Sequence, residues 1–220
     1  MNTQKTKKII NNVKEKINEL NSTTLCFGGP RVQKLPWGCN ENDGRCKVVK
    51  KYLYKLIEDA IKNGYSTFIS GIALGFDMIC AEIVLDLKKK YPNIKLVCAV
   101  PCKDQAKIWN VIFQKKYEKI LSRADKIRCI YDKYVDGCML ERNKYMINNS
   151  SYLIAYYDGT GGGTKYIINY AKKQKIKTKI FYLKKEYSKK DIFTDPFMKY
   201  DGTPVYFQDI LESTISSFYN

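Results

Sequence analysis

Three apolar stretches of this chain each run directly into a turn that contains glycine. The stretches cover residues 23–27, 66–69 and 152–157, and the turns that follow them cover residues 28–31, 70–77 and 158–164. A helical pattern begins directly after each of the last two turns. A strand, a glycine turn and a helix in this order point backbone N–H groups and a helix N-terminus at one place, which attracts phosphate. A tight turn without a ligand is the alternative for any one of these motifs.

Strand and helix patterns alternate along the chain. Further strands are predicted at residues 95–100, 126–131 and 178–183, and helices at 48–63, from 77 to about 90, at 104–123, after Gly137, and at 165–173. This order predicts an α/β fold, a Rossmann-like parallel sheet flanked by helices on both faces. Ligands of such sheets bind outside the carboxyl ends of the strands, at the point where the strand order reverses. We therefore expect the three glycine turns to meet at one crevice.

Composition divides the chain into three parts. Residues 1–22 are predicted to form an N-terminal helix, because Ile9, Ile10, Val13, Ile17 and Leu20 recur at helical spacing. Residues 23–183 form the ligand-binding domain. Residues 184–220 are interpreted as a C-terminal arm rich in aromatic residues, with a short helix at 207–218. The arm is expected to pack on the domain or on a second subunit of a homo-oligomer.

Charge and residue content exclude several classes of protein. The net charge is +17, which attracts polyanions such as nucleic acid, although lysines spread over helix faces are also typical of a solvated surface. The chain has no histidine and no CxxC pair, so neither a structural zinc site nor a histidine-based nucleophile is expected, and we predict no metal and no cofactor. No apolar run is long enough to span a membrane, and the first 20 residues lack the apolar segment of a signal peptide. We expect a cytoplasmic protein without a membrane partner.

Four motifs in a fixed order resemble a known family. They cover residues 26–38, 68–77, 137–143 and 157–165. The series is similar to the YpsA-like family of the SLOG superfamily, which also includes DprA-like and Lonely-guy-like Rossmannoid proteins. The resemblance extends over about residues 23–183.

The resemblance implies a Rossmannoid domain that binds a nucleotide or a nucleotide-derived ligand, such as an ADP-ribose or NAD derivative or a cyclic nucleotide. Members of the superfamily include sensors of NAD-derived signals in bacterial immunity, and YpsA-like proteins are associated with cell division in Gram-positive bacteria. Two positions depart from the relatives. Pro30 stands where the family usually has histidine, and Ile167 stands where Lonely-guy enzymes carry a glutamate. The second departure argues against phosphoribohydrolase activity.

Several polar residues near the turns are candidate ligand contacts. Arg31 can pair with a phosphate through its planar guanidinium, and Arg142 and Asn143 begin a helix after a strand end, which suits a second phosphate contact. Gln105 and Trp109, expected one turn apart on a helix, can bond and stack on a base, although a helical aromatic is more often a core residue. The whole predicted ligand-binding set is Gly28, Gly29, Arg31, Lys34, Ser70, Gly71, Gly75, Asp77, Pro101, Gln105, Trp109, Arg142, Asn143, Asp158, Gly161, Gly162, Gly163 and Thr164.

The two carboxylates of this set have alternative roles. Asp77 can accept hydrogen bonds from a ribose or cap its helix. Asp158 can hold a ribose hydroxyl or brace its own loop. The favoured function is binding of a nucleotide-derived small molecule by a sensor, a sequestering protein or a regulator. The alternatives are a nucleotide N-glycoside hydrolase, in which Asp77 or Asp158 supplies the carboxylate, and DprA-like nucleic-acid binding.

Overall fold

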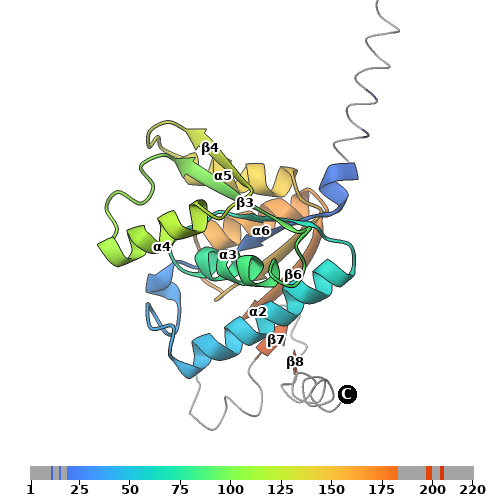
Figure 1. Ribbon diagram of the computed structural model, residues 1–220, viewed down its shortest axis with the longest axis horizontal. Helices are drawn as coiled ribbons and strands as arrows, with labels where there is room; N and C mark the ends of the chain where they lie inside the picture. Colours follow the sequence, from blue (N-terminus) through green and yellow to red (C-terminus); the bar gives the residue numbers. More distant parts are fainter. Residues whose placement is uncertain (1–10, 12–14, 16–18, 183–196, 200–203, 206–220) are drawn as a thin grey trace, which may run out of the picture.

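The computed structural model of the chain describes residues 11, 15, 19–182, 197–199 and 204–205, and its core is a parallel sheet (Figure 1). Six strands pair in parallel in the order β4-β3-β2-β1-β5-β6, and two short strands continue the sheet in antiparallel fashion beyond β6. The strands are β1 (Thr24–Gly28), β2 (Thr67–Ser70), β3 (Lys95–Cys102), β4 (Lys126–Tyr131), β5 (Tyr152–Tyr156), β6 (Lys177–Tyr182), β7 (Phe197–Lys199) and β8 (Pro204–Val205).

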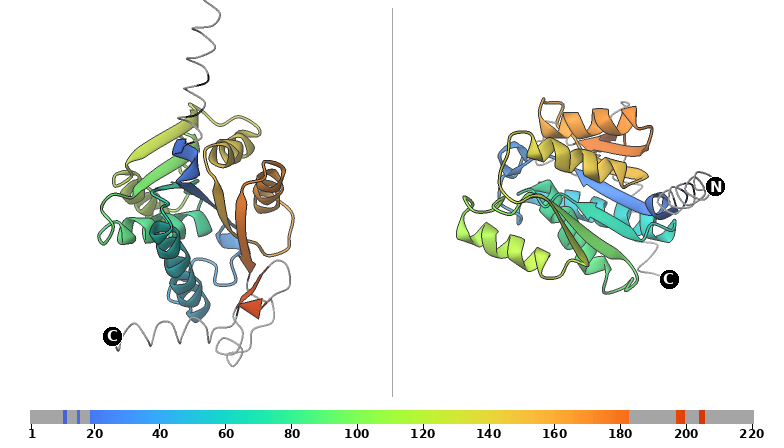
Figure 2. Two further views of the ribbon diagram at one scale, coloured as in Figure 1. Left: turned by 90° about the vertical axis from the view of Figure 1, so that its right-hand side faces the viewer. Right: turned by 90° about the horizontal axis from the view of Figure 1, so that it is seen from above.

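Helices cover both faces of this sheet, as Figure 2 shows from above. One face carries α2 (Gly44–Lys62), α3 (Phe76–Leu87) and α4 (Val111–Leu121), and the other carries α5 (Cys138–Asn148) and α6 (Gly163–Lys173). A single 3-10 turn, η1 (Val32–Lys34), follows β1. Each face has its own apolar core, the larger one under α2 and α3 and the smaller one under α5 and α6. The predicted α/β, Rossmann-like fold is confirmed.

The strand order reverses between β1 and β5. From β1 the chain builds β2, β3 and β4 outward on one side, and then returns through α5 to place β5 on the other side of β1. Every residue of β1 and of β5 is buried, as is expected for central strands covered on both faces. At their carboxyl ends Gly28 stands beside Ala155. The turns after β1 and β5 therefore start next to each other.

The element boundaries agree closely with the sequence prediction, with one clear error. The helix predicted at residues 104–123 begins only at Val111. The side chain of Asn110 accepts a hydrogen bond from the N–H of Ile112 at 2.9 Å and caps the helix there. Before this cap, residues 103–108 form turns. Trp109 therefore lies in the segment that leads into α4 and not on the helix itself.

The terminal segments fall largely outside the described residues. Within residues 1–22, positions 11, 15 and 19–22 are helical. The helix predicted at 207–218 lies outside the described part of the chain. None of the helices among the described residues is long and apolar enough to cross a membrane.

A glycine after β1 gives a test of this packing. A Cβ atom on Gly29 would lie 2.3 Å from the ring of Phe76, which is fully buried and stacks on Tyr156 with ring centroids 5.9 Å apart. We predict that Gly29→Ala lowers the free energy of unfolding by about 1–3 kcal/mol, because the ring cannot move without disturbing the core. Urea denaturation measures the effect. The matched control is Gly44→Ala, since a Cβ there meets no atom within 4 Å; equal stability of the two variants would contradict the prediction.

Candidate functional site

The three glycine turns meet at one cavity of about 400 Å³ beyond the carboxyl ends of β1 and β5. We call it the glycine-turn cavity. The turns after β1, β2 and β5 and the first turns of α5 all contribute to it. Its lining includes Gly28, Gly29, Arg31, Lys34, Ala73, Asp77, Met139, Arg142, Asn143, Asp158, Thr160, Gly161, Gly162, Gly163, Thr164 and Ile167. The predicted convergence of the turns is present in the structure.

A lysine and an aspartate brace the turn after β5. Lys34 donates from Nζ to Oγ1 of Thr160 at 3.0 Å and to the carbonyl oxygen of Gly161 at 2.9 Å, which ties the turn after β1 to the turn after β5. Asp158 accepts hydrogen bonds at Oδ1 from the N–H of Thr160 at 2.9 Å and from its hydroxyl at 2.8 Å. Of the two roles considered for Asp158, the structure shows the bracing of its own loop.

The first turn of α6 borders the cavity. The first N–H groups of a helix have no acceptor inside the helix. No side chain caps this end of α6, and its first turn contains no acidic residue. The N-cap residue Gly162 has φ +116°, a backbone conformation that favours glycine. The N-terminus of α6 therefore presents unpaired donors and a partial positive charge to the cavity.

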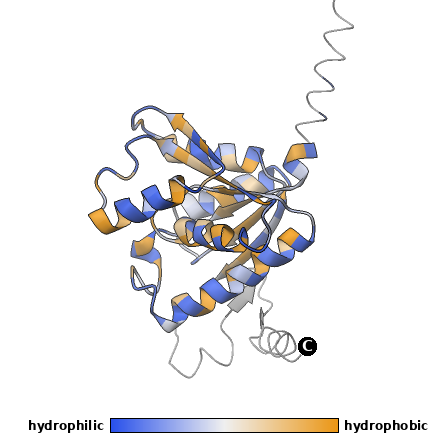
Figure 3. Ribbon diagram, viewed as in Figure 1, coloured by the Kyte–Doolittle hydropathy of each residue, from blue (hydrophilic) through white to orange (hydrophobic). Residues whose placement is uncertain are grey.

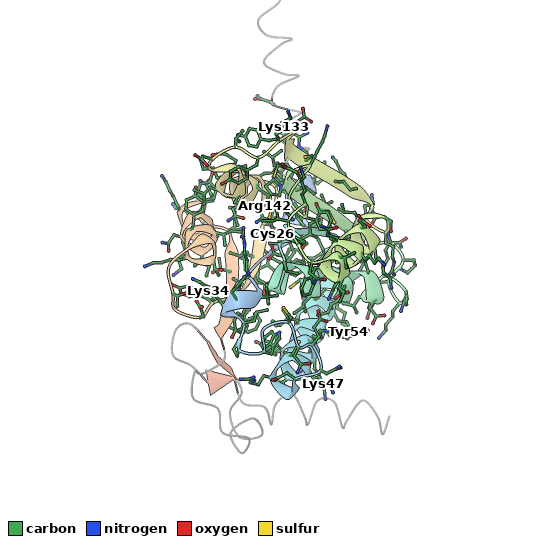
Figure 4. The ribbon with its side chains drawn as sticks, turned by 90° about the vertical axis from the view of Figure 1, so that its left-hand side faces the viewer. Cys26, Lys34, Lys47, Tyr54, Lys133 and Arg142 are labelled. Atoms are coloured by element: carbon green, nitrogen blue, oxygen red, sulfur yellow. The ribbon has the colours of Figure 1, made fainter. Side chains whose placement is uncertain are left out.

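Two arginines line the cavity, one exposed to solvent and one buried. Arg31 is exposed, and its guanidinium forms no ion pair with any residue that the structure describes. Arg142, on α5, is only 5% exposed. Lys34 and Arg142, both labelled in Figure 4, come from distant parts of the sequence and line the same cavity. Planar guanidinium groups recognise carboxylates and phosphates through paired hydrogen bonds.

Arg142 is held by a buried polar cluster. Its Nη1 donates to the carbonyl oxygen of Gly71 and lies 3.6 Å from Oδ2 of Asp77, while its Nε has no hydrogen-bond partner among the described residues. Burial raises the pKa of the Asp77 carboxyl to about 6, although Arg142 and the backbone N–H of Ala73 act in the opposite direction. Burial also lowers the pKa of Arg142, and Asp77 counteracts it.

Six predicted residues lie outside the glycine-turn cavity, and four of them have packing roles. The Ser70 hydroxyl is buried; it donates to the carbonyl oxygen of Asp77 at 2.8 Å and accepts from the N–H of Ile72 at 3.1 Å. The space above Gly71 is occupied by the guanidinium of Arg142, and Gly75 lies against the backbone of residues 30–32. Pro101 is buried within β3. Their roles as ligand contacts stay predictions.

Gln105 and Trp109 line a second cavity of about 880 Å³, which we call the aromatic cavity. It lies beside the glycine-turn cavity, and both are lined by Arg31, Gln33, Ala73 and Met139. Part of its lining comes from the segment before α4, which includes Ile108, while Phe113 lies on α4 and Tyr134 follows β4. The sequence predicted Gln105 and Trp109 at the same site as the glycine turns, and the structure places them in the neighbouring cavity.

Sequence reasoning missed several lining residues. Thr160 lies inside the glycine motif, where a hydroxyl between glycines is a recognisable signal. Met139 and Leu140 lie in the first turn of α5, after the N-cap residue Gly137, which has φ +80°. The glycine in the sequence could have indicated that this first turn also lines the cavity. No sequence pattern marks Ala73 or Gln33 as lining residues. They enter the site only through the path of the backbone.

The chain matches a known protein family over most of its length. The YpsA family, described as the YspA SLOG family, matches residues 25–193. The chain belongs to this family. The resemblance seen in the four motifs is thus confirmed, and the match includes the three turns that form the glycine-turn cavity.

Two bacterial relatives show the extent of the similarity. The chain is 40% identical over 138 residues to the uncharacterised SPbeta prophage-derived protein YoqJ of Bacillus subtilis (strain 168), which covers 57% of this chain and 81% of YoqJ. It is 31% identical over 138 residues to a UPF0398 protein of Bacillus cereus (strain ATCC 14579), covering 61% of this chain and 74% of that protein.

Two solved structures share the fold of this SLOG protein. DNA processing protein A from Helicobacter pylori, described for its single-stranded DNA binding mode, superposes with a TM-score of 0.52 at 21% identity, covering 79% of this chain and 70% of that one. DNA processing protein A (DprA) from Streptococcus pneumoniae gives 0.51 at 13% identity, covering 77% of this chain and only 53% of that one. At such identities the likeness shows the fold alone.

The buried Asp77 carboxyl predicts a pH dependence of stability. Its pKa is about 6 in the folded chain, against an ordinary value of 3.8, so between these pH values the folded state binds more protons than the unfolded state. The contribution of Asp77 to the free energy of unfolding is therefore full below about pH 4 and is lost as the pH rises through about 6. We predict that the free energy of unfolding of the wild type, measured with urea, falls relative to that of Asp77→Asn over this interval.

The control for this measurement is Asp132→Asn. In the wild type, the Asp132 carboxylate lies on the surface and pairs with Lys103 at 2.6 Å. The hydrogen bond from Lys103 lowers the pKa of that carboxyl, so the contribution of Asp132 to the free energy of unfolding changes with pH in the opposite direction. A difference between wild type and Asp77→Asn that stays constant from pH 4 to pH 7 would contradict the assignment.

Proposed function

We propose that the glycine-turn cavity binds the phosphate-bearing part of a nucleotide-derived small molecule. The observation that carries this proposal is the uncapped N-terminus of α6 at the switch point of the sheet, with Arg31 and Lys34 beside it. A helix N-terminus and cations at this place in a parallel sheet favour a phosphate. The cavity volume of about 400 Å³ lies within the range of small-molecule sites.

The charges around the cavity support an anionic ligand. Arg31, Lys34 and Arg142 contribute three cations, and the carboxylates among the lining residues are Asp77 and Asp158. Asp77 is paired with Arg142, and Asp158 is bonded to its own loop. Arg31 is thus the exposed cation that is left for a ligand, and we propose a contact between it and a phosphate oxygen.

Binding without cleavage is the favoured role, as in a sensor, a sequestering protein or a regulator. The hydrolase alternative requires a free carboxylate near a ribose. Asp158 is engaged by Thr160. Asp77 is 6% exposed and faces Arg142 through Oδ2, although its Oδ1 has no hydrogen-bond partner among the described residues. The position occupied by glutamate in Lonely-guy enzymes is the buried Ile167. An ADP-ribose or NAD derivative or a cyclic nucleotide is the proposed ligand class.

The proposal is tested by titrating the full chain with ADP-ribose, NAD, AMP and cyclic AMP in a thermal-shift assay, followed by calorimetry. A ligand at 100 times its Kd stabilises the folded state by about 2.7 kcal/mol, which is readily measured. We predict that Arg31→Ala weakens binding about 10- to 100-fold, because a hydrogen bond to a charged group contributes about 1.5–3 kcal/mol.

The control is Lys47→Ala, which removes one positive charge from an exposed position of α2 away from the cavity (Figure 4). It keeps the net charge equal to that of Arg31→Ala, so a general electrostatic effect appears in both variants. If none of the four compounds stabilises the wild type, or if both variants weaken binding equally, the proposed site is wrong.

Nucleic-acid binding is a second candidate, because the net charge is +17 and one structural neighbour is described for its single-stranded DNA binding mode. Such binding depends on many phosphate contacts and on counterion release. If it is the function, affinity for a single-stranded oligonucleotide falls steeply between 50 and 200 mM salt and survives Arg31→Ala. Fluorescence anisotropy measures both. Affinity that is insensitive to salt, or absent, contradicts this candidate. A homo-oligomer and a cytoplasmic location stay predictions.

A further inference from the structure

The aromatic cavity opens beside the glycine-turn cavity. Arg31, Gln33, Ala73 and Met139 line both cavities. The aromatic cavity alone, at about 880 Å³, is near the upper end of the volumes of small-molecule sites. A ligand that filled only the glycine-turn cavity would leave it empty.

We infer that the two cavities form one bipartite site, in which the aromatic cavity holds the heteroaromatic ring of the nucleotide whose phosphate lies against α6. This inference rests on the proposed function and deepens it. It assigns the base-binding residues to the segment before α4. It also sets the direction of the ligand, which extends from the α6 N-terminus, past Arg31, toward Trp109.

Trp109 is suited to stack on a ring. Its side chain is half-buried, and its indole meets the ring of Tyr117 edge-to-face with centroids 5.4 Å apart and an interplanar angle of 81°. Tyr117 is itself buried, at 6% exposure, and so fixes the indole. A rigid, partly exposed aromatic ring in a cavity provides a stacking surface, and base stacking is worth about 1–3 kcal/mol per base.

Gln105 supplies an acceptor that the fold leaves unpaired. Its Nε2 donates to the carbonyl oxygen of Ile72 at 3.1 Å, which fixes the orientation of the amide. Its Oε1 is buried and has no hydrogen-bond partner among the described residues. Burial of an unpaired carbonyl oxygen is unfavourable. An amino group or ring N–H of a base would satisfy it, whereas an aliphatic ligand would not.

Ile72 connects this amide to the phosphate-binding turns. Its φ is +41°, a conformation that is uncommon for a β-branched residue. The buried Ser70 hydroxyl accepts from its N–H, and Gln105 donates to its carbonyl oxygen. The turn after β2 is therefore fixed from both sides, and it lies between the two cavities through Ala73. Such strain is found at functional sites.

Exposed apolar residues around the same cavity suggest an alternative interpretation, in which this surface is a protein interface. Ile108 is 91% exposed, and Val111 and Ile112 at the start of α4 are 59% and 70% exposed. The start of α4 has the colour of hydrophobic residues in Figure 3. Only Ile108 of these three lines the cavity. The unpaired Gln105 acceptor and the shared Arg31 favour a small polar ring over a protein partner, and the experiment separates the two.

The experiment compares AMP with ribose 5-phosphate by calorimetry on the full chain. The two probes share the phosphoribosyl group, and only AMP has a base. We expect AMP to bind the wild type about 5- to 100-fold more tightly than ribose 5-phosphate. Trp109→Ala should remove most of this difference and leave binding of ribose 5-phosphate unchanged. Arg31→Ala should weaken both probes.

A second pair of variants keeps the test independent of the packing of Trp109 on Tyr117. Ile108→Glu and Ile112→Glu make the same change of charge at two exposed positions, of which only the first lines the cavity. We expect Ile108→Glu to weaken AMP binding at least about fivefold more than Ile112→Glu does.

Each failure is distinguishable. If AMP and ribose 5-phosphate bind the wild type equally and Trp109→Ala changes neither, the bipartite site is wrong while the phosphate site stands. If neither probe binds, and the other nucleotides of the panel also fail, the proposed function is wrong. If Ile108→Glu leaves AMP binding unchanged but shifts the sedimentation coefficient from that of an oligomer to that of a monomer, the aromatic cavity is a protein interface and the inference is overturned.

Discussion

The parallel pairing of β1 with β5 determines where the candidate site can lie. These two strands come from distant parts of the sequence, and their pairing places Gly28 beside Ala155. Because the strand order reverses between them, the turns after β1 and β5 leave the sheet at one point and diverge from each other. The space between them becomes the glycine-turn cavity. Lys34 then fixes the distance between the turns through its bonds to Thr160 and Gly161.

The buried guanidinium of Arg142, on α5, completes the wall of this cavity. Removing a guanidinium from water is costly unless it is paired and hydrogen-bonded. Asp77 and the carbonyl oxygen of Gly71 partly satisfy Arg142, but its Nε remains without a partner in the described part of the chain. Gly71 is required for this arrangement, because a Cβ there would lie 1.7 Å from Nη1. The glycine therefore makes room for a side chain of the protein, and that side chain in turn lines the site.

The sequence predicted the sheet and the three turns because both follow from local patterns. Apolar runs, glycines and helical periodicity are adjacent in the chain, and the rule for parallel sheets brings the turns together. The position of Trp109 could not be predicted in this way. The periodicity of residues 104–123 favoured a helix, but Asn110 caps α4, and the amide of Gln105 bonds to Ile72, 33 residues earlier in the chain. Contacts over such a separation leave no periodic signal.

The packing of α6 against β1 connects the fold to the choice between binding and cleavage. A Cβ on Gly28 would lie 2.9 Å from Cγ2 of Ile167, so this isoleucine is in close contact with the end of the central strand. It is 2% exposed and belongs to the smaller apolar core. A carboxylate at this position would have to enter that core, where its charge would be unfavourable. The same close approach that brings the α6 N-terminus to the glycine-turn cavity therefore leaves position 167 to an apolar side chain. In the proposed function this wall binds the anionic part of the ligand, and the buried polar atoms without a partner among the described residues near it include Arg142 Nε, Asp77 Oδ1 and Gln105 Oε1.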